Sequence, residues 1–153
     1  MKKLLALILA AALALSLVAC GGGKAKEDAA KKAAELLSGT TWGHATDAIL
    51  GNRIYHLLVF SKSNDVYGDV EFAIQYGDTN TFQARGRYTV STKDENIVEV
   101  KYDEQLKDGT WGPVEEGRTD SDKFCYVIDS GEITELYRVD KNGDATDIFI
   151  KLD

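Results

Sequence analysis

The stretch VYGDVEFAIQYGDTNTFQARGRYTV, residues 66–90, contains two runs in which apolar and polar side chains alternate. A period of two places successive side chains on opposite faces of a β-strand. Gly and Asp, which favour turns, separate the runs 66–76 and 82–90. The stretch therefore predicts an antiparallel hairpin, and we expect Tyr76 to lie opposite Phe82.

This register separates apolar side chains from charged ones. Glu71 faces Arg87 on one side of the hairpin, as opposite charges on neighbouring strands should. On the other side, Gly86 faces a large aromatic residue and leaves some room beside it. The apolar pairs on that side are Val70 with Tyr88, Phe72 with Gly86, and Ile74 with Ala84.

The same periodicity continues from residue 40 to the end of the chain, with turn residues between the runs. A meander of antiparallel strands loses its exposed edges when it closes into a barrel. We therefore expect an all-β domain of about eight strands forming a closed barrel, and a two-sheet sandwich is the alternative. The expected strands are 40–44, 53–61, 66–76, 82–90, 97–103, 119–129, 132–139 and 145–152.

A second hairpin is predicted around Asn142-Gly143, a strong signal for a type I′ turn. Counting outward places Arg138 opposite Asp147 and Tyr137 opposite Ile148. We expect one face of this hairpin to point into the barrel. Its members are Ile133, Tyr137, Val139, Ile148, Ile150 and Leu152.

A third hairpin is predicted at the two-residue loop Ser130-Gly131, with Ile128 opposite Ile133 and Tyr126 opposite Glu135. This register places the Glu135 carboxylate on the apolar face, where burial without a partner is costly. Glu135 is then either a polar anchor at the end of a ligand cavity or a rim residue bonded to a tyrosine or to water. A slip of one residue would put it outside the barrel.

The opposite face of these strands carries the apolar row Cys125, Leu136 and Phe149. Such a row is an exposed patch for a partner or a seat for another element. The preceding segment 24–38, KAKEDAAKKAAELLS, is rich in helix formers and predicts a short helix. We expect this helix to be a spacer or to cover the row through Leu36 and Leu37.

The first residues have the layout of a secretory signal. Lys2 and Lys3 precede the uncharged stretch Leu4–Val18, and the small residue Ala19 stands directly before Cys20. A membrane-spanning helix needs about 20 apolar residues and is the alternative. A disulfide between Cys20 and Cys125 is a further alternative.

The segment Leu17-Val18-Ala19-Cys20 resembles the lipobox of bacterial lipoproteins. The resemblance implies cleavage before Cys20 and attachment of diacylglyceryl to its thiol, which anchors a protein stably to a membrane. The expected location is the extracytoplasmic face of the cell membrane, or the outer membrane in a Gram-negative host. The expected units are the signal peptide 1–19, the lipidated cysteine with its glycine linker and helix 20–38, and the barrel domain 39–153.

From Gly39 onward the chain carries twelve Lys and Arg against twenty-two Asp and Glu. Such an acidic surface is a poor partner for nucleic acid or for an anionic membrane. It favours a water-exposed domain without a basic binding face.

The sequence offers few candidates for catalytic or metal-binding residues. His44 and His56 do not stand at a metal-binding spacing, and no nucleophile elbow or phosphate loop is present. The run Asp140–Asp144 lacks the glycine and glutamate of a calcium loop, and Glu115-Glu116 fits a solvated loop. Cys125 fits a half-buried apolar residue. We therefore expect neither an enzyme nor a metal or cofactor site.

The stretch Gly39-Thr40-Thr41-Trp42 before a meander of this size resembles the start of lipocalins and related calycins. The resemblance implies a barrel that holds a small apolar or amphipathic ligand. The alternative is an interaction or envelope-structural module with a fully packed core. In the alternative to the resemblance itself, Trp42 is an ordinary core residue. Trp111 is a loop residue, either a lid or folded back onto the barrel end. The candidate ligand-binding residues are Phe72, Tyr76, Phe82, Tyr88, Tyr102, Tyr126 and Glu135.

Overall fold

The computed structural model describes residues 23–46, 53–115 and 121–152. The expectations for the signal peptide, for lipidation at Cys20 and for Glu116 lie outside these residues. The chain forms one helix and nine strands in the described part. They are α2 (Gly23–Leu37), β1 (Thr41–Ala45), β2 (Ile54–Asn64), β3 (Tyr67–Tyr76), β4 (Thr79–Val90), β5 (Ile97–Lys107), β6 (Thr110–Pro113), β7 (Ser121–Asp129), β8 (Glu132–Val139) and β9 (Ala145–Leu152).

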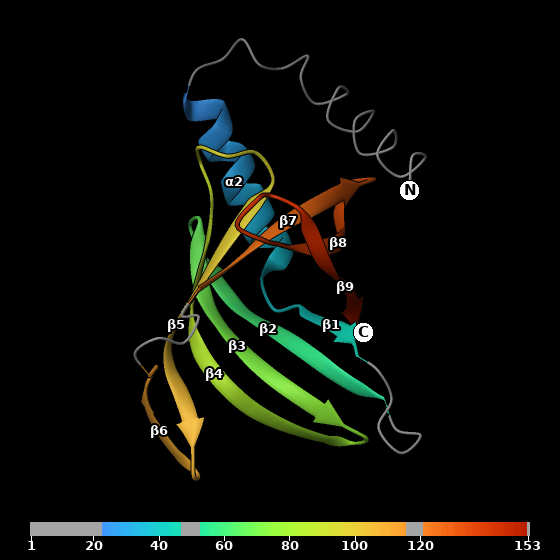
Figure 1. Ribbon diagram of the computed structural model, residues 1–153. Helices are drawn as coiled ribbons and strands as arrows, with labels where there is room; N and C mark the ends of the chain where they lie inside the picture. Colours follow the sequence, from blue (N-terminus) through green and yellow to red (C-terminus); the bar gives the residue numbers. More distant parts are fainter. Residues whose placement is uncertain (1–22, 47–52, 116–120, 153) are drawn as a thin grey trace.

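Eight of the strands close into an antiparallel barrel (Figure 1). The sheet runs β4-β3-β2-β1-β9-β8-β7-β5, and pairing between β4 and β5 completes the circle. The expected all-β barrel is confirmed. The ninth strand, β6, pairs with β5 after a tight turn in which Asp108 and Gly109 have φ of 51° and 77°. The expectation of a loop at Trp111 is wrong, because this turn lets the chain fold back as a short strand.

Helix α2 covers one end of the barrel (Figure 1). Its buried residues recur every three or four positions and form one apolar stripe: Ala30, Ala33, Ala34 and Leu37. The helix ends where Ser38 N donates to the Ala34 carbonyl at 3.0 Å and Gly39 adopts a φ of 72°, a conformation that glycine accommodates at a helix C-terminus. The predicted helix is confirmed. It packs on the barrel through this stripe and is therefore more than a spacer.

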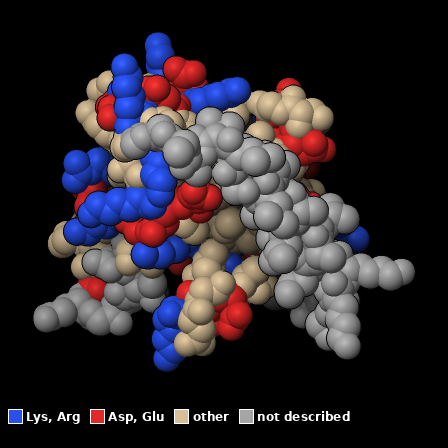
Figure 2. Space-filling model, turned by 90° about the horizontal axis from the view of Figure 1, so that it is seen from above, with Lys and Arg blue, Asp and Glu red and all other residues tan. Residues whose placement is uncertain are grey.

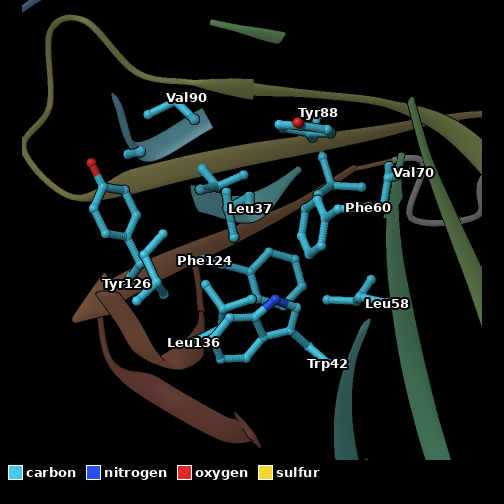
Figure 3. Packing of buried hydrophobic residues seen from close by; sticks show 14 of the residues in the cluster. Leu37, Trp42, Leu58, Phe60, Val70, Tyr88, Val90, Phe124, Tyr126 and Leu136 are labelled. Atoms are coloured by element: carbon cyan, nitrogen blue, oxygen red, sulfur yellow. The ribbon is translucent and has the colours of Figure 1, made fainter. Parts of the chain in front are cut away.

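Leu37 is fully buried and lies among core side chains of the barrel, including Phe60, Tyr88 and Phe124 (Figure 3). Trp42 is also fully buried in this cluster, as expected if it is an ordinary core residue. Its indole Nε1 donates to Thr40 Oγ1 at 2.8 Å, and Thr40 Oγ1 donates to the Leu37 carbonyl at 2.5 Å. These bonds link the end of the helix to the first strand.

The register of the β3–β4 hairpin differs from the expected one by three residues next to the turn and by two residues beyond a bulge. Tyr76 pairs with Thr79 across Gly77, whose φ is 59°, so the turn is shorter than expected. A bulge at Phe72/Ala73 then sets the pairs Phe72 with Ala84, Val70 with Gly86, Gly68 with Tyr88 and Glu71 with Arg85. A shift of two keeps each side chain on its face, so the separation of apolar and polar side chains largely survives.

The β7–β8 hairpin starts in the expected register, because Ile128 pairs with Ile133. A bulge at Val127/Ile128 then adds one residue, so Tyr126 pairs with Leu136 and Val127 with Glu135. One residue is enough to exchange the two faces of a strand. The expected position of Glu135 on the inner face is therefore wrong.

The β8–β9 hairpin has the expected pair Tyr137 with Ile148, but its faces are reversed from Glu135 onward, whereas Ile133 lies in the core as expected. Ile148 and Ile150 are 47% and 54% exposed, whereas Leu136 and Phe149 are fully buried in the core. The row Cys125, Leu136 and Phe149 is therefore divided. Leu136 and Phe149 share the core with α2, whereas Cys125 pairs with Tyr137 and is half-buried.

Gly86 is required where β4 and β5 approach each other. A Cβ atom at this position would lie 1.9 Å from the Lys101 carbonyl oxygen and 2.7 Å from Tyr102 Cα. The room beside Gly86 is thus taken up by the backbone of β5, not left for a ligand.

We predict that Gly86→Ala lowers the free energy of unfolding by at least about 2 kcal/mol, because backbone atoms cannot move aside as a side-chain end can. Gly112→Ala is the matched control, since a Cβ there meets nothing within 4 Å. We expect it to stay within about 0.5 kcal/mol of the wild type. Urea unfolding measures both, and equal stability of the two variants would contradict the described approach of β4 and β5.

Candidate ligand-binding site

Six polar side chains lie inside the barrel at the end away from α2. Ser63 N donates to Ser38 Oγ, Gly39 N donates to the Phe60 carbonyl, and Lys31 pairs with Asp65. These contacts place α2 at the end that carries the β2–β3 turn. Five of these side chains lie toward the opposite ends of their strands, and Tyr102 lies at the middle of β5. We call all six the polar cluster: His44 of β1, His56 of β2, Tyr102 of β5, Asp122 of β7, Arg138 of β8 and Asp147 of β9.

Arg138 is at the centre of the polar cluster. Its Nη1 lies 3.1 Å from Asp147 Oδ2, and its Nη2 lies 3.5 Å from Asp122 Oδ2. The guanidinium carbon lies 5.9 Å and 5.7 Å from the ring centres of Phe124 and Phe149, both fully buried. Arg138 thus separates the apolar core, which it contacts through a cation–π arrangement, from the polar end of the barrel.

Each carboxylate of the cluster has a second neighbour. The Tyr102 hydroxyl donates to Asp122 Oδ2 at 3.3 Å, and His44 Nε2 lies 3.7 Å from Asp147 Oδ1. Burial, followed by the charge of Asp122, raises the pKa of Tyr102 above its usual value. Tyr102 therefore stays protonated and acts as a donor throughout the physiological pH range.

Aromatic and imidazole rings complete the wall of the site. His56 lies 5.6 Å from Phe72, and Phe72 lies 6.4 Å from Tyr102, both in edge-on geometry. Phe72 is on β3 and Tyr102 on β5, the two strands that flank β4, so their rings meet over the inner face of β4. His44 Nδ1 lies 2.9 Å from the Ile148 carbonyl; because a carbonyl only accepts, this nitrogen carries the proton and donates.

The pKa of His56 is lowered from its usual value of 6.5. Burial is the main cause, and the positive charge of Arg138 and the neighbouring His44 add to it. His56 is therefore neutral at neutral pH.

Solvent reaches the polar cluster although the barrel surrounds it. The side chains of Asp122, His44, Arg138 and Asp147 are 19%, 25%, 27% and 33% exposed. Solvent does not reach the core next to them, because Phe124, Phe149 and Leu136 are 0% exposed. A small solute can therefore touch the cluster, whereas the half of the barrel next to α2 is filled by side chains.

The structure brings together only two of the residues that the sequence suggested for ligand binding. Phe72 and Tyr102 line the polar cluster. Tyr88 and Tyr126 belong to the packed core, and Tyr76 and Phe82 are 46% and 37% exposed. Glu135 is on the outer face, where it accepts a hydrogen bond from the Tyr137 hydroxyl.

Sequence reasoning missed the polar cluster because it placed Arg138 and Asp147 outside the barrel. Their side chains do form an ion pair, but on the inner face of the hairpin and not on the outer one. A signal was present, since each member of the cluster stands two positions from a fully buried residue on the same strand. These neighbours are Trp42 for His44, Leu58 for His56, Val100 for Tyr102, Phe124 for Asp122, Leu136 for Arg138 and Phe149 for Asp147.

Other residues singled out in the sequence have ordinary roles. Glu115 pairs with Lys107 at 2.5 Å. Asp140 Oδ1 accepts bonds from the backbone nitrogens of Asp144 and Asn142, which stabilise the turn and lower the Asp140 pKa. Trp111 lies under the Arg85 guanidinium at 4.4 Å.

The Cys125 thiol is half-buried, and burial raises its pKa, so its reactive thiolate form is disfavoured. Within the parts of the chain that the structure describes, no group of three His, Cys, Asp or Glu side chains is arranged to hold a metal ion. No helix in residues 23–46, 53–115 or 121–152 is both long enough and apolar enough to cross a membrane.

Comparisons with protein-family models, curated proteins and solved structures find no match for this chain. The closed eight-stranded barrel is compatible with a lipocalin-like fold.

The lowered pKa of His56 predicts a pH dependence of stability. Below about pH 6.5 the unfolded chain binds a proton at this histidine that the folded chain resists, so the free energy of unfolding falls as the pH falls. Urea unfolding at pH 7.5 and pH 5.0 measures the loss. In His56→Asn the loss should be smaller, whatever the stability of that variant at pH 7.5. An identical loss in both proteins would contradict the described environment of His56.

Proposed function

We propose that this protein is a lipoprotein of the bacterial cell envelope, anchored through a lipid on Cys20 with its barrel on the extracytoplasmic side. The lipobox-like segment supports this proposal. Two residues stand between Cys20 and the start of α2 at Gly23, so three Cα–Cα steps keep the anchor within about 11 Å of the helix. The membrane is thus the partner of the anchored end.

This attachment would orient the barrel. The 15 residues of α2 span about 22 Å, and the helix covers one end of the barrel. Figure 2 looks down on this end and shows Lys and Arg side chains interleaved with Asp and Glu. The α2 end then faces the membrane, where lysines such as Lys24 and Lys26 suit anionic headgroups. The polar cluster faces the aqueous side.

We further propose that the barrel is a noncatalytic binding domain for a small amphipathic ligand, in the manner of a lipocalin. One observation carries this proposal: the side chains around Arg138 are enclosed by strands yet remain one-fifth to one-third exposed. Ligand sites commonly combine apolar walls with a few polar groups that fix orientation. Because core side chains fill the α2 half, the ligand would bind at the polar end, with a polar group on the cluster and its apolar part against Phe72.

A second candidate function is an interaction or envelope-structural module. The outer face of β9 supports it, because Ile148 and Ile150 are about half exposed on adjacent outward positions. Exposed apolar side chains that cluster can mark a protein interface. In that case the barrel would only be the support for this face.

Native mass spectrometry of the protein extracted from its host tests these proposals together. The expected mass is that of a chain beginning at a diacylated Cys20, with a small molecule bound in a stoichiometric amount. Cys20→Ser is the control and should lose the lipid while keeping the small molecule. A wild-type chain without lipid would contradict the anchor, and a lipidated chain without any small molecule would favour the second candidate function.

A further inference from the structure

The polar cluster has a definite charge balance. It contains one arginine and two aspartates, and these three side chains together carry a net negative charge. The lowered pKa of His56 is consistent with a neutral ring at that position. Tyr102 adds no charge, because the pKa of its hydroxyl is raised. A ligand that enters this part of the barrel therefore meets an excess of negative charge.

Arg138 is a poor anchor for an anion. Its Nη1 and Nη2 already face Asp147 and Asp122, and its Nε is buried without an acceptor among the described residues. An anionic group that reached the remaining N–H groups of Arg138 would lie close to both carboxylates. At short range, repulsion between like charges in a partly buried site costs more than it does in water. The arrangement therefore disfavours fatty acids and other anionic amphiphiles.

The carboxylates, in contrast, keep capacity for another donor. Asp122 is 19% and Asp147 33% exposed, and a carboxylate has about four acceptor positions. Asp147 Oδ2 faces Arg138 and its Oδ1 faces His44, while both contacts of Asp122 are made by Oδ2. A cationic group can approach these oxygens without displacing Arg138.

The aromatic wall of the site suits the same kind of ligand. The cation–π contacts in the described part of the chain involve Arg138 over Phe124 and Phe149, and Arg85 over Trp111. No described Lys or Arg lies over Phe72 or Tyr102. Cations with an apolar body bind well where aromatic faces and carboxylates occur together, because the ring quadrupole attracts positive charge.

The size of the ligand is limited by the core. The α2 half of the barrel is filled by fully buried side chains such as Leu37, Phe124 and Phe149, so a long alkyl chain has no room behind Arg138. A compact body of about the size of one aromatic ring fits this constraint better. The acidic surface of the domain would also attract a cation and raise its association rate.

We propose that the polar cluster binds a small amphipathic cation, such as an aromatic or quaternary amine, with its charge near Asp122 and Asp147 and its apolar part against Phe72 and Tyr102. This inference rests on the proposed function and adds to it the charge and size of the ligand.

Three probes of similar size separate the charge types: benzyltrimethylammonium, benzyl alcohol and phenylacetate. We would titrate each into the full-length chain in nanodiscs of phosphatidylcholine, which carries no net charge, at 0.15 M NaCl and pH 7.5. Empty nanodiscs provide the background. The inference predicts that benzyltrimethylammonium binds at least tenfold more tightly than phenylacetate, with benzyl alcohol between them.

Variants then locate the preference. Asp122→Asn and Asp147→Asn should each reduce the cation-to-anion ratio at least threefold. Asp129→Asn is the matched control, because it removes the same charge from the exposed end of β7 and should leave the ratio unchanged.

The outcomes distinguish the inference from the proposed function. Binding of all three probes with equal affinity, or tighter binding of phenylacetate, would overturn the cation preference while leaving a ligand-binding barrel. A preference that falls equally in all three variants would show attraction by the acidic surface and would overturn the site. Binding of none of the probes would contradict both the inference and ligand binding at this end of the barrel.

Discussion

A closed eight-stranded barrel has an interior that must be filled, and in this chain the filling depends on helix α2. Eight strands leave room for side chains and for at most one small ligand. Leu37 and the alanines of α2 supply the last apolar surface at one end, where they meet the core residues of the strands (Figure 3). This packing fixes which face of each strand points inward, and thereby places Arg138 and Asp147 inside the barrel.

The consequence for function is a barrel with two unlike halves. The half next to α2 is a packed apolar core, and the other half contains charged and hydrogen-bonding groups that solvent reaches. Arg138 forms the boundary, since its guanidinium lies over Phe124 and Phe149 and its outer nitrogens face two carboxylates. A buried charge needs such partners, because an isolated one would cost several kcal/mol. The same partners determine which ligand charge the site favours.

Much of this fold could be predicted from the sequence. Alternation with a period of two and the turn residues predict the strands, their order and the closed barrel, and the Asn142-Gly143 signal leads to the correct pair Tyr137 with Ile148. These features are local, so a short window of sequence contains the necessary information.

The faces of the strands and the polar cluster could not be predicted in the same way. The bulge between the pairs Ile128–Ile133 and Val127–Glu135 is not marked by Gly or Pro, yet its one extra residue reverses the faces of β8 from Glu135 onward. Both faces of β9 carry large apolar residues, so alternation alone does not tell whether Ile148 or Phe149 is buried. That choice depends on packing against α2 and against strands far away in the sequence, and it decides whether Arg138 and Asp147 are inside.

A double-mutant cycle on Arg138 and Asp147 measures most directly whether this pair belongs to the interior of the barrel. The comparison is the same cycle on Arg87 and Asp103, an ion pair of 3.6 Å whose side chains are 69% and 45% exposed. The interior position predicts a coupling free energy of at least about 1 kcal/mol for Arg138 and Asp147. The exposed pair should give about 0.5 kcal/mol or less. Equal, near-zero coupling in the two cycles would contradict a polar cluster inside the barrel.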